Sequence, residues 1–470
     1  MTKLTRALVD DAARYFDTWL AFRQRYDRVP GIQAAVLHGG DVLLSTAHGQ
    51  ADLETPTALT PRHLFRVASH SKTFTATAVF QLVERGSLRL DDTAAHWVPF
   101  LADTGLGAVS VRELLSHSGG VIRDGRDGDH WQLFRAFPDE ARLREIGTDG
   151  ADVLPANERF KYSNVGYSLL GLIIAAAAGQ PYPDYVRDNI VEQLELGDTG
   201  PDYNRARAAE YATGYSALSY AERRIPIEQV GTGAMAAATG FYSTASDLVR
   251  YASAHFHGDE RLLTDAAKRQ MQRTEWDTGS RDSEYGLGFD ISEVGDRRVV
   301  GHGGGWPGHI TSTKFDPADG FAVSVLTNAI DGLAGLYALG FVRLVELGLK
   351  PSDEPAAPGG VALDRFCGRF ANLWGVFDVV RLGERLFLLT PMADDPTEEP
   401  MLLTVVDDST LRMSGDSGFA SPGEALRYTF GADSVESVRG GSGSSAYPYD
   451  SFAGAAQGRD RVTLGSPLTP

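Results

Sequence analysis

Ser69 and Lys72 stand three residues apart at the start of an apolar run, and their types and spacing suit nucleophilic catalysis. On a helix, residues three apart share a face, so the lysine amine can reach the serine hydroxyl. A neutral amine can take the hydroxyl proton and so make the serine a nucleophile. The alternative is structural, because a helix start with an exposed lysine is the common explanation of so short a pattern.

The use of lysine in this chain favours the catalytic interpretation. Lysine and arginine together number 44, but lysine occurs only at Lys3, Lys72, Lys161, Lys268, Lys314 and Lys350. Arginine is effectively never deprotonated in proteins, whereas burial readily lowers the pKa of a lysine. Apolar residues follow Lys72 and predict that its helix is buried, so we expect Lys72 to act as a base.

A second polar group precedes another apolar helix. The sequence Phe-Lys-Tyr-Ser-Asn covers residues 160–164 and places Tyr162 and Asn164 at the mouth of that helix. The structural interpretation is a capped helix start with a half-buried tyrosine. The functional interpretation makes Tyr162 an acid or base, which requires a cation such as Lys72 to lower its pKa from the reference value of about 10.

A glycine-rich stretch, residues 301–309, follows a strand-like run and contains His302 and Trp306. Its glycines allow a substrate to approach the backbone closely and leave N–H groups free to face an oxyanion. The alternative is a plain glycine-rich turn between strands. No phosphate-binding helix follows the stretch, which argues against a nucleotide loop.

The histidines and the single cysteine give no support to a metal site. His117 ends a predicted helix over 111–115 and is interpreted as a structural or wall residue. The other histidines lack ligand spacing, and Cys367 alone excludes an internal disulfide and any cysteine-based metal centre. We therefore expect no metal and no cofactor.

Composition narrows the classes of partner. The 470 residues carry a net charge of −18 and a pI near 5.0, which argues against nucleic acid and anionic membranes. A small molecule or short peptide fits better as substrate, and a homo-oligomer is left open. The first residues carry acids where a signal peptide needs apolar ones, and no run is long enough to span a bilayer, so we predict a cytoplasmic protein.

The elements that must position these residues follow from periodicity and turn signals. The runs 31–38 and 41–47 predict a β-hairpin, and 69–85 a buried helix. The middle of the chain is mainly helical, at 111–115, 164–178, 182–194 and 244–255. Strands return at 285–291, 298–301, 310–316 and 321–327, before a helix over 336–349. Strands at both ends predict that the N- and C-terminal parts share one sheet.

The last part of the chain has a different pattern. Residues 351–360 are rich in proline and glycine and predict a linker between domains at 1–350 and 361–470. Short strands at 377–389, 401–406 and 425–430 predict a small antiparallel barrel or sandwich, for which we favour a lipocalin-like barrel. The Gly- and Ser-rich segment 437–449 predicts a mobile loop or tail.

Three motifs in this order resemble the serine β-lactamase and penicillin-binding-protein superfamily, in its class C-like branch with D-aminopeptidases and esterases. They are Ser-x-x-Lys at 69–72, Tyr-Ser-Asn at 162–164 and His-Gly-Gly at 302–304. The segments 114–120, 240–248 and 285–289 resemble further signatures of that branch. The resemblance covers residues 10 to 350. It implies an α/β (α+β) fold, with an antiparallel sheet flanked by helices and a helical subdomain.

The resemblance also implies a role for each motif residue. Ser69 would be the nucleophile, Lys72 its activating amine and Tyr162 the proton shuttle. His302, in the third motif, would be the fourth catalytic residue. The backbone N–H groups of Ser69 and Gly305 would form the oxyanion hole. Substrate would be bound by Asn164, Gly303, Gly304, Gly305 and Trp306.

His302 is the informative departure, because it takes the place of the lysine in the usual Lys-Thr-Gly motif. Histidine is mostly neutral at pH 7 and makes a poor fixed anchor for a substrate carboxylate. This favours an aminopeptidase or amidase acting on small peptides or amides, including those with D-amino acids. A carboxylesterase is the alternative, because motif and fold do not separate the two.

Two further functions remain as alternatives. β-Lactam hydrolysis is disfavoured because Lys-Thr-Gly is missing. A non-catalytic penicillin-binding protein, which forms a slow adduct or none, is the hypothesis from a different class. The role of the C-terminal domain is left open.

Overall fold

The computed structural model describes residues 4–280, 283–351, 361–415, 421–432, 434–440, 443–457, 459–466 and 468–470. The chain divides into two compact units. Unit 2 is Asp27–Leu339, and unit 1 combines Met1–Tyr26 with Gly340–Pro470. The expected domain limits at 350 and 361 stay a prediction, and nearly all of the expected linker, 352–360, lies outside the described residues.

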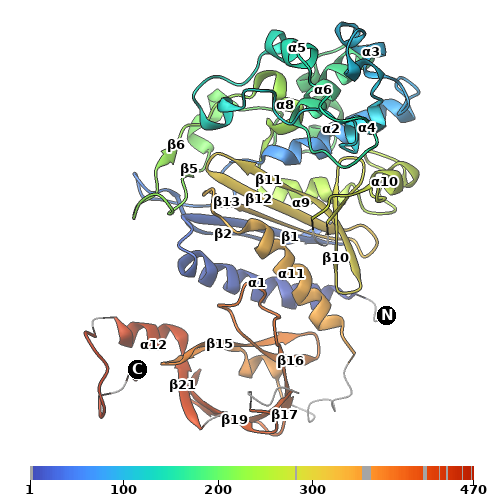
Figure 1. Ribbon diagram of the computed structural model, residues 1–470. Helices are drawn as coiled ribbons and strands as arrows, with labels where there is room; N and C mark the ends of the chain where they lie inside the picture. The colour runs from blue at the N-terminus through green and yellow to red at the C-terminus, as the bar shows by residue number, and fades with distance from the viewer. Residues whose placement is uncertain are drawn as a thin grey trace. The chain divides into compact units, whose positions relative to one another are not determined.

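One antiparallel sheet of nine strands organises unit 2, in the order β3-β2-β1-β13-β12-β11-β10-β9-β8 (Figure 1). Its centre pairs β1 (Gly31–His38) with β13 (Phe321–Thr327), with Ile32 opposite Thr327. β13 is buried along its whole length, which explains its continuous apolar run. This pairing confirms that strands from the two ends of unit 2 share one sheet.

The remaining strands of the sheet extend on either side of this central pair. They are β2 (Asp41–Asp52), β3 (Thr57–Ala58), β8 (Trp276–Asp277), β9 (Glu284–Tyr285), β10 (Asp290–Val294), β11 (Arg297–Trp306) and β12 (His309–Asp316). The turn between β1 and β2 consists of Gly39 and Gly40, at φ 58° and 92°. Positive φ at both positions is the requirement of the tight hairpin turn, so the predicted hairpin forms at these glycines.

The predicted single strand over 285–291 is wrong, because the structure breaks it into β9 and β10. Gly288 between them has φ 97°, and a Cβ there would lie 2.3 Å from the Cβ of Ala76 on helix α2 (Ser71–Glu84). The backbone therefore leaves the sheet at this glycine to pass close to α2, which an alternating apolar pattern does not reveal.

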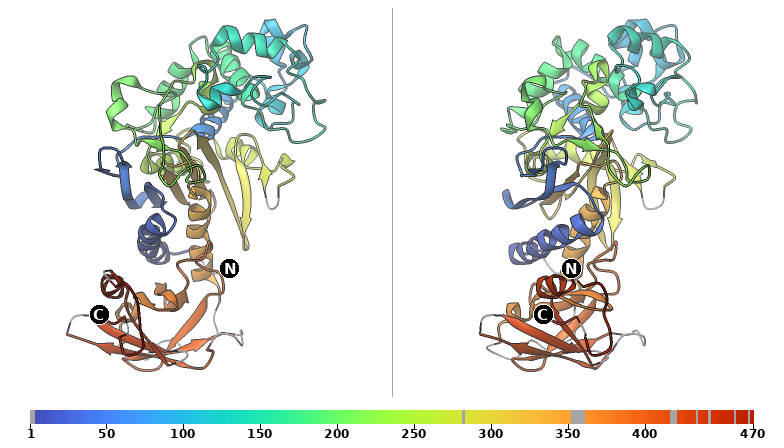
Figure 2. Two further views of the ribbon diagram at one scale, coloured as in Figure 1. Left: turned by 60° about the vertical axis from the view of Figure 1, so that its left-hand side comes forward. Right: turned by 90° about the vertical axis from the view of Figure 1, so that its left-hand side faces the viewer.

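Helices of unit 2 gather beside the sheet around α2 (Figures 1 and 2). Helix α2 packs against α6 (Asn164–Ala178) and α8 (Ala236–Thr239). Its residues 71–82 are all buried, which explains why the apolar residues of α2 are not confined to one face of the helix. Further helices of unit 2 are α3 (Ala94–Trp97), α4 (Val111–Leu115), α5 (Glu140–Thr148), α9 (Ala245–Ser253) and α10 (Asp265–Met271). Two small two-stranded sheets pair β4 (Phe65–Arg66) with β7 (Tyr242–Ser243) and β5 (Gly214–Tyr215) with β6 (Pro226–Ile227).

The predicted helix over 182–194 is shorter and irregular. It begins as α7 (Tyr182–Val186) and continues as a π-helical turn, Arg187–Val191. Of the helices described, none is by itself long and apolar enough to cross a membrane. Only α6 with Tyr182–Val191, which are bent by 79°, meets that test of length and composition as a pair.

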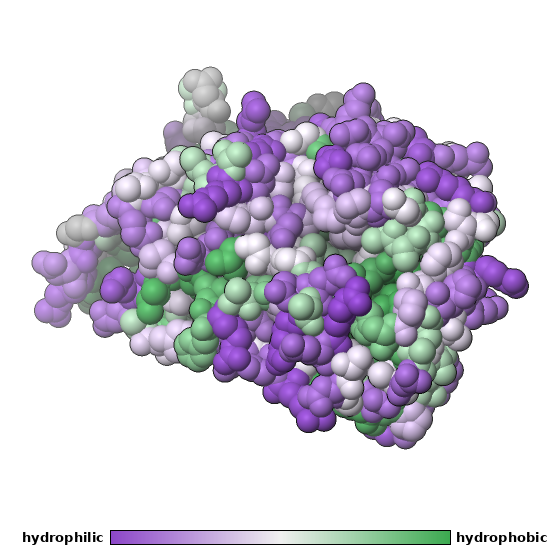
Figure 3. Space-filling model, turned by 90° about the horizontal axis from the view of Figure 1, so that it is seen from above, coloured by the Kyte–Doolittle hydropathy of each residue, from purple (hydrophilic) through white to green (hydrophobic). Residues whose placement is uncertain are grey.

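The face of the molecule seen in Figure 3 is mostly hydrophilic, with apolar side chains in smaller patches. Charged side chains on α5 form exposed ion pairs of the kind that contribute little to stability, such as Arg142 with Glu145 and Arg144 with Glu140.

Unit 1 joins α1 (Arg6–Tyr26) and the C-terminal part of α11 (Ala334–Leu349) to a barrel. Phe16 of α1 lies 5.2 Å from Phe341 of α11, measured between ring centroids. The Trp19 indole N–H donates to the Pro391 carbonyl at 3.0 Å. One face of α1 is buried, including Leu8, Ala12, Tyr15 and Trp19, and Leu4 just before the helix is buried as well.

The strands of unit 1 form a closed antiparallel barrel, so of the two predicted forms, barrel and sandwich, the barrel is confirmed. Its apolar core includes Phe366, Leu403 and Val438. Its strands are β14 (Gly368–Asn372), β15 (Gly375–Leu382), β16 (Arg385–Leu389), β17 (Met401–Val405), β18 (Thr410–Ser414), β19 (Ala425–Phe430), β20 (Val435–Gly440) and β21 (Ser444–Pro448).

The prediction of a mobile segment at 437–449 is wrong for its described residues. β20 and β21 pair there, with Val438 opposite Ala446, and helix α12 (Tyr449–Ala456) follows. β21 also pairs with β14 and so closes the barrel. Glycine and serine concealed these strands, because the residues that face the core are few and stand apart in the sequence.

Candidate active site

Ser69 lies in a 3-10 turn, Ala68–His70, directly before α2 rather than inside the helix. Ala68 has φ 44°, a left-handed conformation that costs energy for a residue with a side chain. The Ser71 hydroxyl holds this turn, because it donates to the Ala68 carbonyl at 2.6 Å and accepts from the Phe241 N–H at 3.0 Å. The strained turn leaves Ser69 partly exposed at the start of a buried helix.

Lys72 is fully buried with its amine beside the serine. Its Nζ lies 3.2 Å from Ser69 Oγ and donates to Asn164 Oδ1 at 2.7 Å and to the Ala238 carbonyl at 2.8 Å. Burial holds the pKa of Lys72 well below its usual range. A neutral amine has two N–H donors, which Asn164 and Ala238 occupy, so its lone pair is left for the Ser69 hydroxyl.

Tyr162 completes the group around the nucleophile, because its phenol donates to Ser69 Oγ at 2.8 Å. The expectation that Lys72 lowers the pKa of Tyr162 is wrong. Burial raises the pKa of this phenol instead, and the Lys72 amine lies 4.7 Å from the ring centroid, against the ring rather than at the oxygen. Tyr162 is therefore a neutral phenol that can give a proton.

Asn164 begins helix α6 and connects Lys72 to a carboxylate. While its Oδ1 accepts from Lys72, its Nδ2 donates to Asp124 Oδ1 at 2.6 Å, and the Trp131 indole donates to the same oxygen at 2.9 Å. Asn164 was predicted to bind substrate, but in this structure its amide oxygen and its amide nitrogen both bond to protein groups. Asp124 was missed from the sequence, although it closely follows the recognised segment 114–120.

Residues 301–306 of the glycine-rich stretch belong to strand β11, residues 307–308 form the turn, and His309 begins β12. β12 pairs with it through Trp306, whereas on the other side β10 pairs only as far as Gly301. Gly304 allows β11 to pass the nucleophile turn, because a Cβ there would lie 2.1 Å from the Val67 carbonyl oxygen. This approach brings Gly305 beside the turn that holds Ser69; their oxyanion hole stays a prediction.

Gly303 and Gly305 differ from Gly304 in the space around them. A Cβ would meet no neighbour closer than 3.6 Å at Gly303 or 3.7 Å at Gly305. Packing within the protein therefore does not demand glycine at these two positions. Their missing side chains leave room along the part of β11 that β10 does not cover.

His302 is uncharged. Its Nδ1 lies 2.6 Å from the Gly303 carbonyl, which can only accept, so Nδ1 carries the proton and Nε2 accepts from the Tyr285 hydroxyl at 3.1 Å. Burial lowers the pKa of His302 to about 4. Among the described residues, its hydrogen bonds go to these groups rather than to Ser69 or Tyr162. Tyr285 opens the recognised segment 285–289 but was given no role from sequence.

Trp306, predicted to bind substrate, is wholly buried. It stacks on Phe137 with 5.3 Å between ring centroids, and the Arg66 guanidinium lies 4.0 Å from its ring. The half-buried ring of Trp131 meets it edge-on at 5.9 Å. Phe137, Trp306 and Trp131 therefore form a cluster of packed rings, the aromatic wall, in which Trp131 is more accessible than the other two.

His117 packs against Tyr162. Its Nδ1 accepts from the Ser163 N–H at 3.1 Å, and its ring lies 4.3 Å from the Tyr162 ring. Burial holds the pKa of His117 well below its usual range, so the ring is uncharged. Within the described residues, no group of three or more histidine, cysteine or acidic side chains is arranged to hold a metal ion.

Comparison with known protein families matches residues 18–336 to the family described as Beta-lactamase. The chain belongs to the beta-lactamase family. Penicillin-binding protein 4* of Bacillus subtilis (strain 168) is 30% identical over 294 residues, which cover 58% of this chain and 62% of that protein. The match thus spans less than two thirds of that relative's length.

Solved structures with the same fold include several that cover this chain widely. SurE matches 94% of this chain and 99% of its own, with 26% identity and a TM-score of 0.61. The D-amino acid amidase from Ochrobactrum anthropi SV3, complexed with L-phenylalanine amide, matches 72% and 98%, with 26% identity and a TM-score of 0.60. The octameric penicillin-binding protein homologue from Pyrococcus abyssi matches 90% and 97%, with a TM-score of 0.63; at 23% identity it shows the fold alone.

Proposed function

We propose that this beta-lactamase-family serine hydrolase is an amidase or aminopeptidase that cleaves small peptides or amides, including those of D-amino acids. The observation that carries the proposal is the contact of Ser69 Oγ with both the Tyr162 phenol and the buried Lys72 amine. A base and an acid on one nucleophile are the parts that acyl transfer needs.

In the proposed mechanism, Ser69 Oγ attacks the substrate carbonyl while its proton passes to the Lys72 lone pair. The N–H groups of Ser69 and Gly305 hold the developing oxyanion, and each such donor is typically worth about 10²–10³ in kcat. Tyr162 gives its proton to the leaving amine and recovers one from Lys72 through the water molecule that replaces the amine. Water then attacks the acyl-enzyme by the reverse path and releases the acid.

The uncharged His302 supports an amide substrate that lacks a carboxylate at the usual anchoring position. The pKa of His302, lowered to about 4 by burial, keeps the ring neutral at physiological pH. The similarity to a D-amino acid amidase supports the same substrate class. An ester is the comparison substrate, because the same acyl-enzyme would form from it.

The test compares the wild type with Ser69→Ala on D- and L-alanine p-nitroanilide, p-nitrophenyl butyrate and nitrocefin. We expect selective cleavage of an anilide by the wild type. Ser69→Ala should lose both turnover and labelling by a fluorophosphonate. Preference for the butyrate would make the protein an esterase, and activity retained by Ser69→Ala would refute the acyl-enzyme altogether.

A further inference from the structure

Asp124 is a carboxylate beside the catalytic residues that the mechanism does not use. Its Oδ1 accepts from both Asn164 and Trp131, whereas its Oδ2 is contacted by Arg123 Nε at 3.2 Å. The side chain of Asp124 is 15% exposed and that of Arg123 is 65% exposed. A carboxylate oxygen can accept two hydrogen bonds, so Oδ2 retains capacity for a further donor.

The position of Asp124 relative to the nucleophile follows from its contacts. Asn164 joins it to the Lys72 amine, which in turn lies against Ser69 Oγ. Trp131 joins it to the aromatic wall of Phe137 and Trp306. Trp306 directly follows Gly305, the proposed oxyanion donor, so Asp124 is connected to the neighbourhood of Ser69 through Asn164 and Lys72 on one side and through the aromatic rings on the other.

The chemistry of this arrangement suits an amine. A carboxylate and an ammonium form a charge-assisted hydrogen bond, which is about twice as strong as a neutral one. The aromatic wall beside the carboxylate suits the apolar side chain of the same residue. His302 is uncharged and therefore adds no histidine cation to the site that would repel an ammonium group.

We propose that Asp124 binds the free amino group of the substrate's acyl residue and so selects substrates with an unblocked N-terminus. This rests on the proposed function and names the substrate class of the same site. The competing explanation is that Asp124 only positions Asn164 and Lys72. Under that explanation, its charge would matter equally for substrates with and without an amine.

The test uses substrates that differ only in the amine: phenylalanine p-nitroanilide, as the enantiomer that the enzyme prefers, and 3-phenylpropionyl p-nitroanilide. The variant is Asp124→Asn, which keeps an oxygen to accept from Asn164 and Trp131 but removes the charge. The matched control is Asp129→Asn, because Asp129 is a half-exposed acid of the same loop whose ion pair is with Arg135.

In the wild type we expect the substrate with the amine to have the higher kcat/KM. Asp124→Asn should lower that value about 10- to 100-fold, mainly through KM, and change the substrate without the amine less than about threefold. Asp129→Asn should change neither more than about twofold. Equal losses for both substrates in Asp124→Asn, or a wild-type preference for the substrate without the amine, would overturn the proposal.

Labelling by a fluorophosphonate separates this proposal from the proposed function. If Ser69 of the wild type is not labelled, the acyl-enzyme assignment itself fails. If it is labelled, protection by phenylalanine amide is compared with protection by 3-phenylpropionamide, a measurement that needs no turnover. If Asp124→Asn weakens protection by phenylalanine amide but not by 3-phenylpropionamide, the proposal is supported. If protection by both amides is the same as in the wild type, the role of Asp124 is refuted and the acyl-enzyme assignment stands.

Discussion

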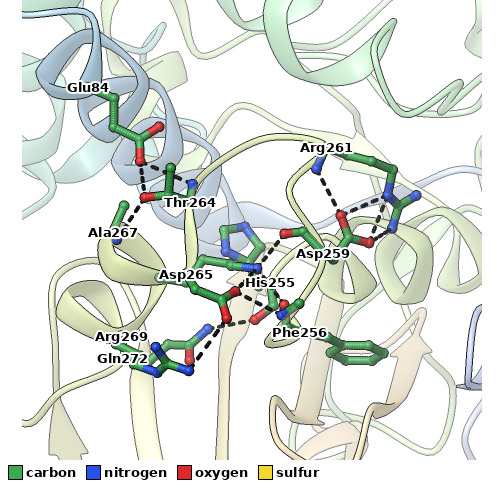
Figure 4. A network of polar contacts seen from close by, with 12 residues as sticks. Glu84, His255, Phe256, Asp259, Arg261, Thr264, Asp265, Ala267, Arg269 and Gln272 are labelled. Carbon is green, nitrogen blue, oxygen red and sulfur yellow. Dashed lines mark hydrogen bonds and ion pairs between the residues drawn. The ribbon is translucent and has the colours of Figure 1, made fainter.

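Lys72 and Lys268 are both fully buried, but the structure surrounds them differently. Lys268 Nζ lies 2.8 Å from the Asp265 carboxylate and also donates to the carbonyls of Phe256 and Asp259. Figure 4 shows Asp265 and these neighbours within one network of polar contacts. Among the described residues, the hydrogen-bond partners of the Lys72 amine are all neutral groups.

This difference separates a lysine held in an ion pair from the lysine that we propose as the base. A carboxylate in contact, such as the partly exposed Asp265 beside Lys268, offsets the cost of removing an ammonium group from water. Without such a carboxylate, burial lowers the pKa of Lys72 and favours the free amine that a base needs. The carboxylate of Asp124 is separated from Lys72 by the Asn164 amide, which bonds to both.

The largest expected effect is the loss of catalysis when Lys72 is replaced by methionine. Lys72→Met removes the base beside Ser69, and we expect acylation to slow by about 10³-fold or more. The rate of fluorophosphonate labelling measures this step directly. Lys268→Met is the matched control, and labelling that slows as much in the control would remove the distinction between the two lysines.

Asn164→Asp would give Lys72 the kind of partner that Lys268 has. A carboxylate at the present position of Oδ1, 2.7 Å from Nζ, raises the pKa of Lys72 and keeps the amine protonated. We expect about 10²-fold lower kcat/KM at pH 7, partly recovered at higher pH. A pH–rate profile checks this, with Asn189→Asp as control because the Asn189 amide contacts Arg85. If the rising limb of the pH–rate profile lay at the same pH as in the wild type, the comparison of Lys72 with Lys268 would be contradicted.

Lys268→Met should affect folding rather than chemistry. The substitution leaves the Asp265 carboxylate without its ammonium partner and two carbonyls without a donor. We expect the free energy of unfolding to fall by about 2–4 kcal/mol, while kcat/KM changes less than about threefold. Urea denaturation followed by fluorescence measures the loss. A stability equal to that of the wild type would show that the pair contributes nothing.

The smallest expected effect is on the pH dependence of stability. The pKa of Lys72 is lower in the folded protein than in the unfolded chain, so between these two values the unfolded state binds the extra proton. Stability relative to Lys72→Met should therefore rise with pH in that window, up to the ordinary lysine pKa of 10.5. Urea denaturation of both proteins at several pH values gives this difference, and a flat or falling difference would contradict it.

Much of the fold follows from local patterns that packing leaves intact. α6 and β13 occupy the predicted residues because long apolar runs with clear ends are determined by short-range preferences. The break at Gly288 and the strands β20 and β21 did not follow from sequence. The first depends on the close approach of α2, and the second on pairing with β14 and β19 to close a barrel.

The sequence by itself determined which groups are available for chemistry: a serine and a lysine three apart, a tyrosine before a helix, and a histidine before a run of glycines. Spacing along one helix is a local property, so Ser69 and Lys72 could be paired without a structure. Only the tertiary structure decided the protonation of these groups and the place of Asp124. Burial and contacts between distant segments set a pKa, and neither is encoded in the neighbouring residues.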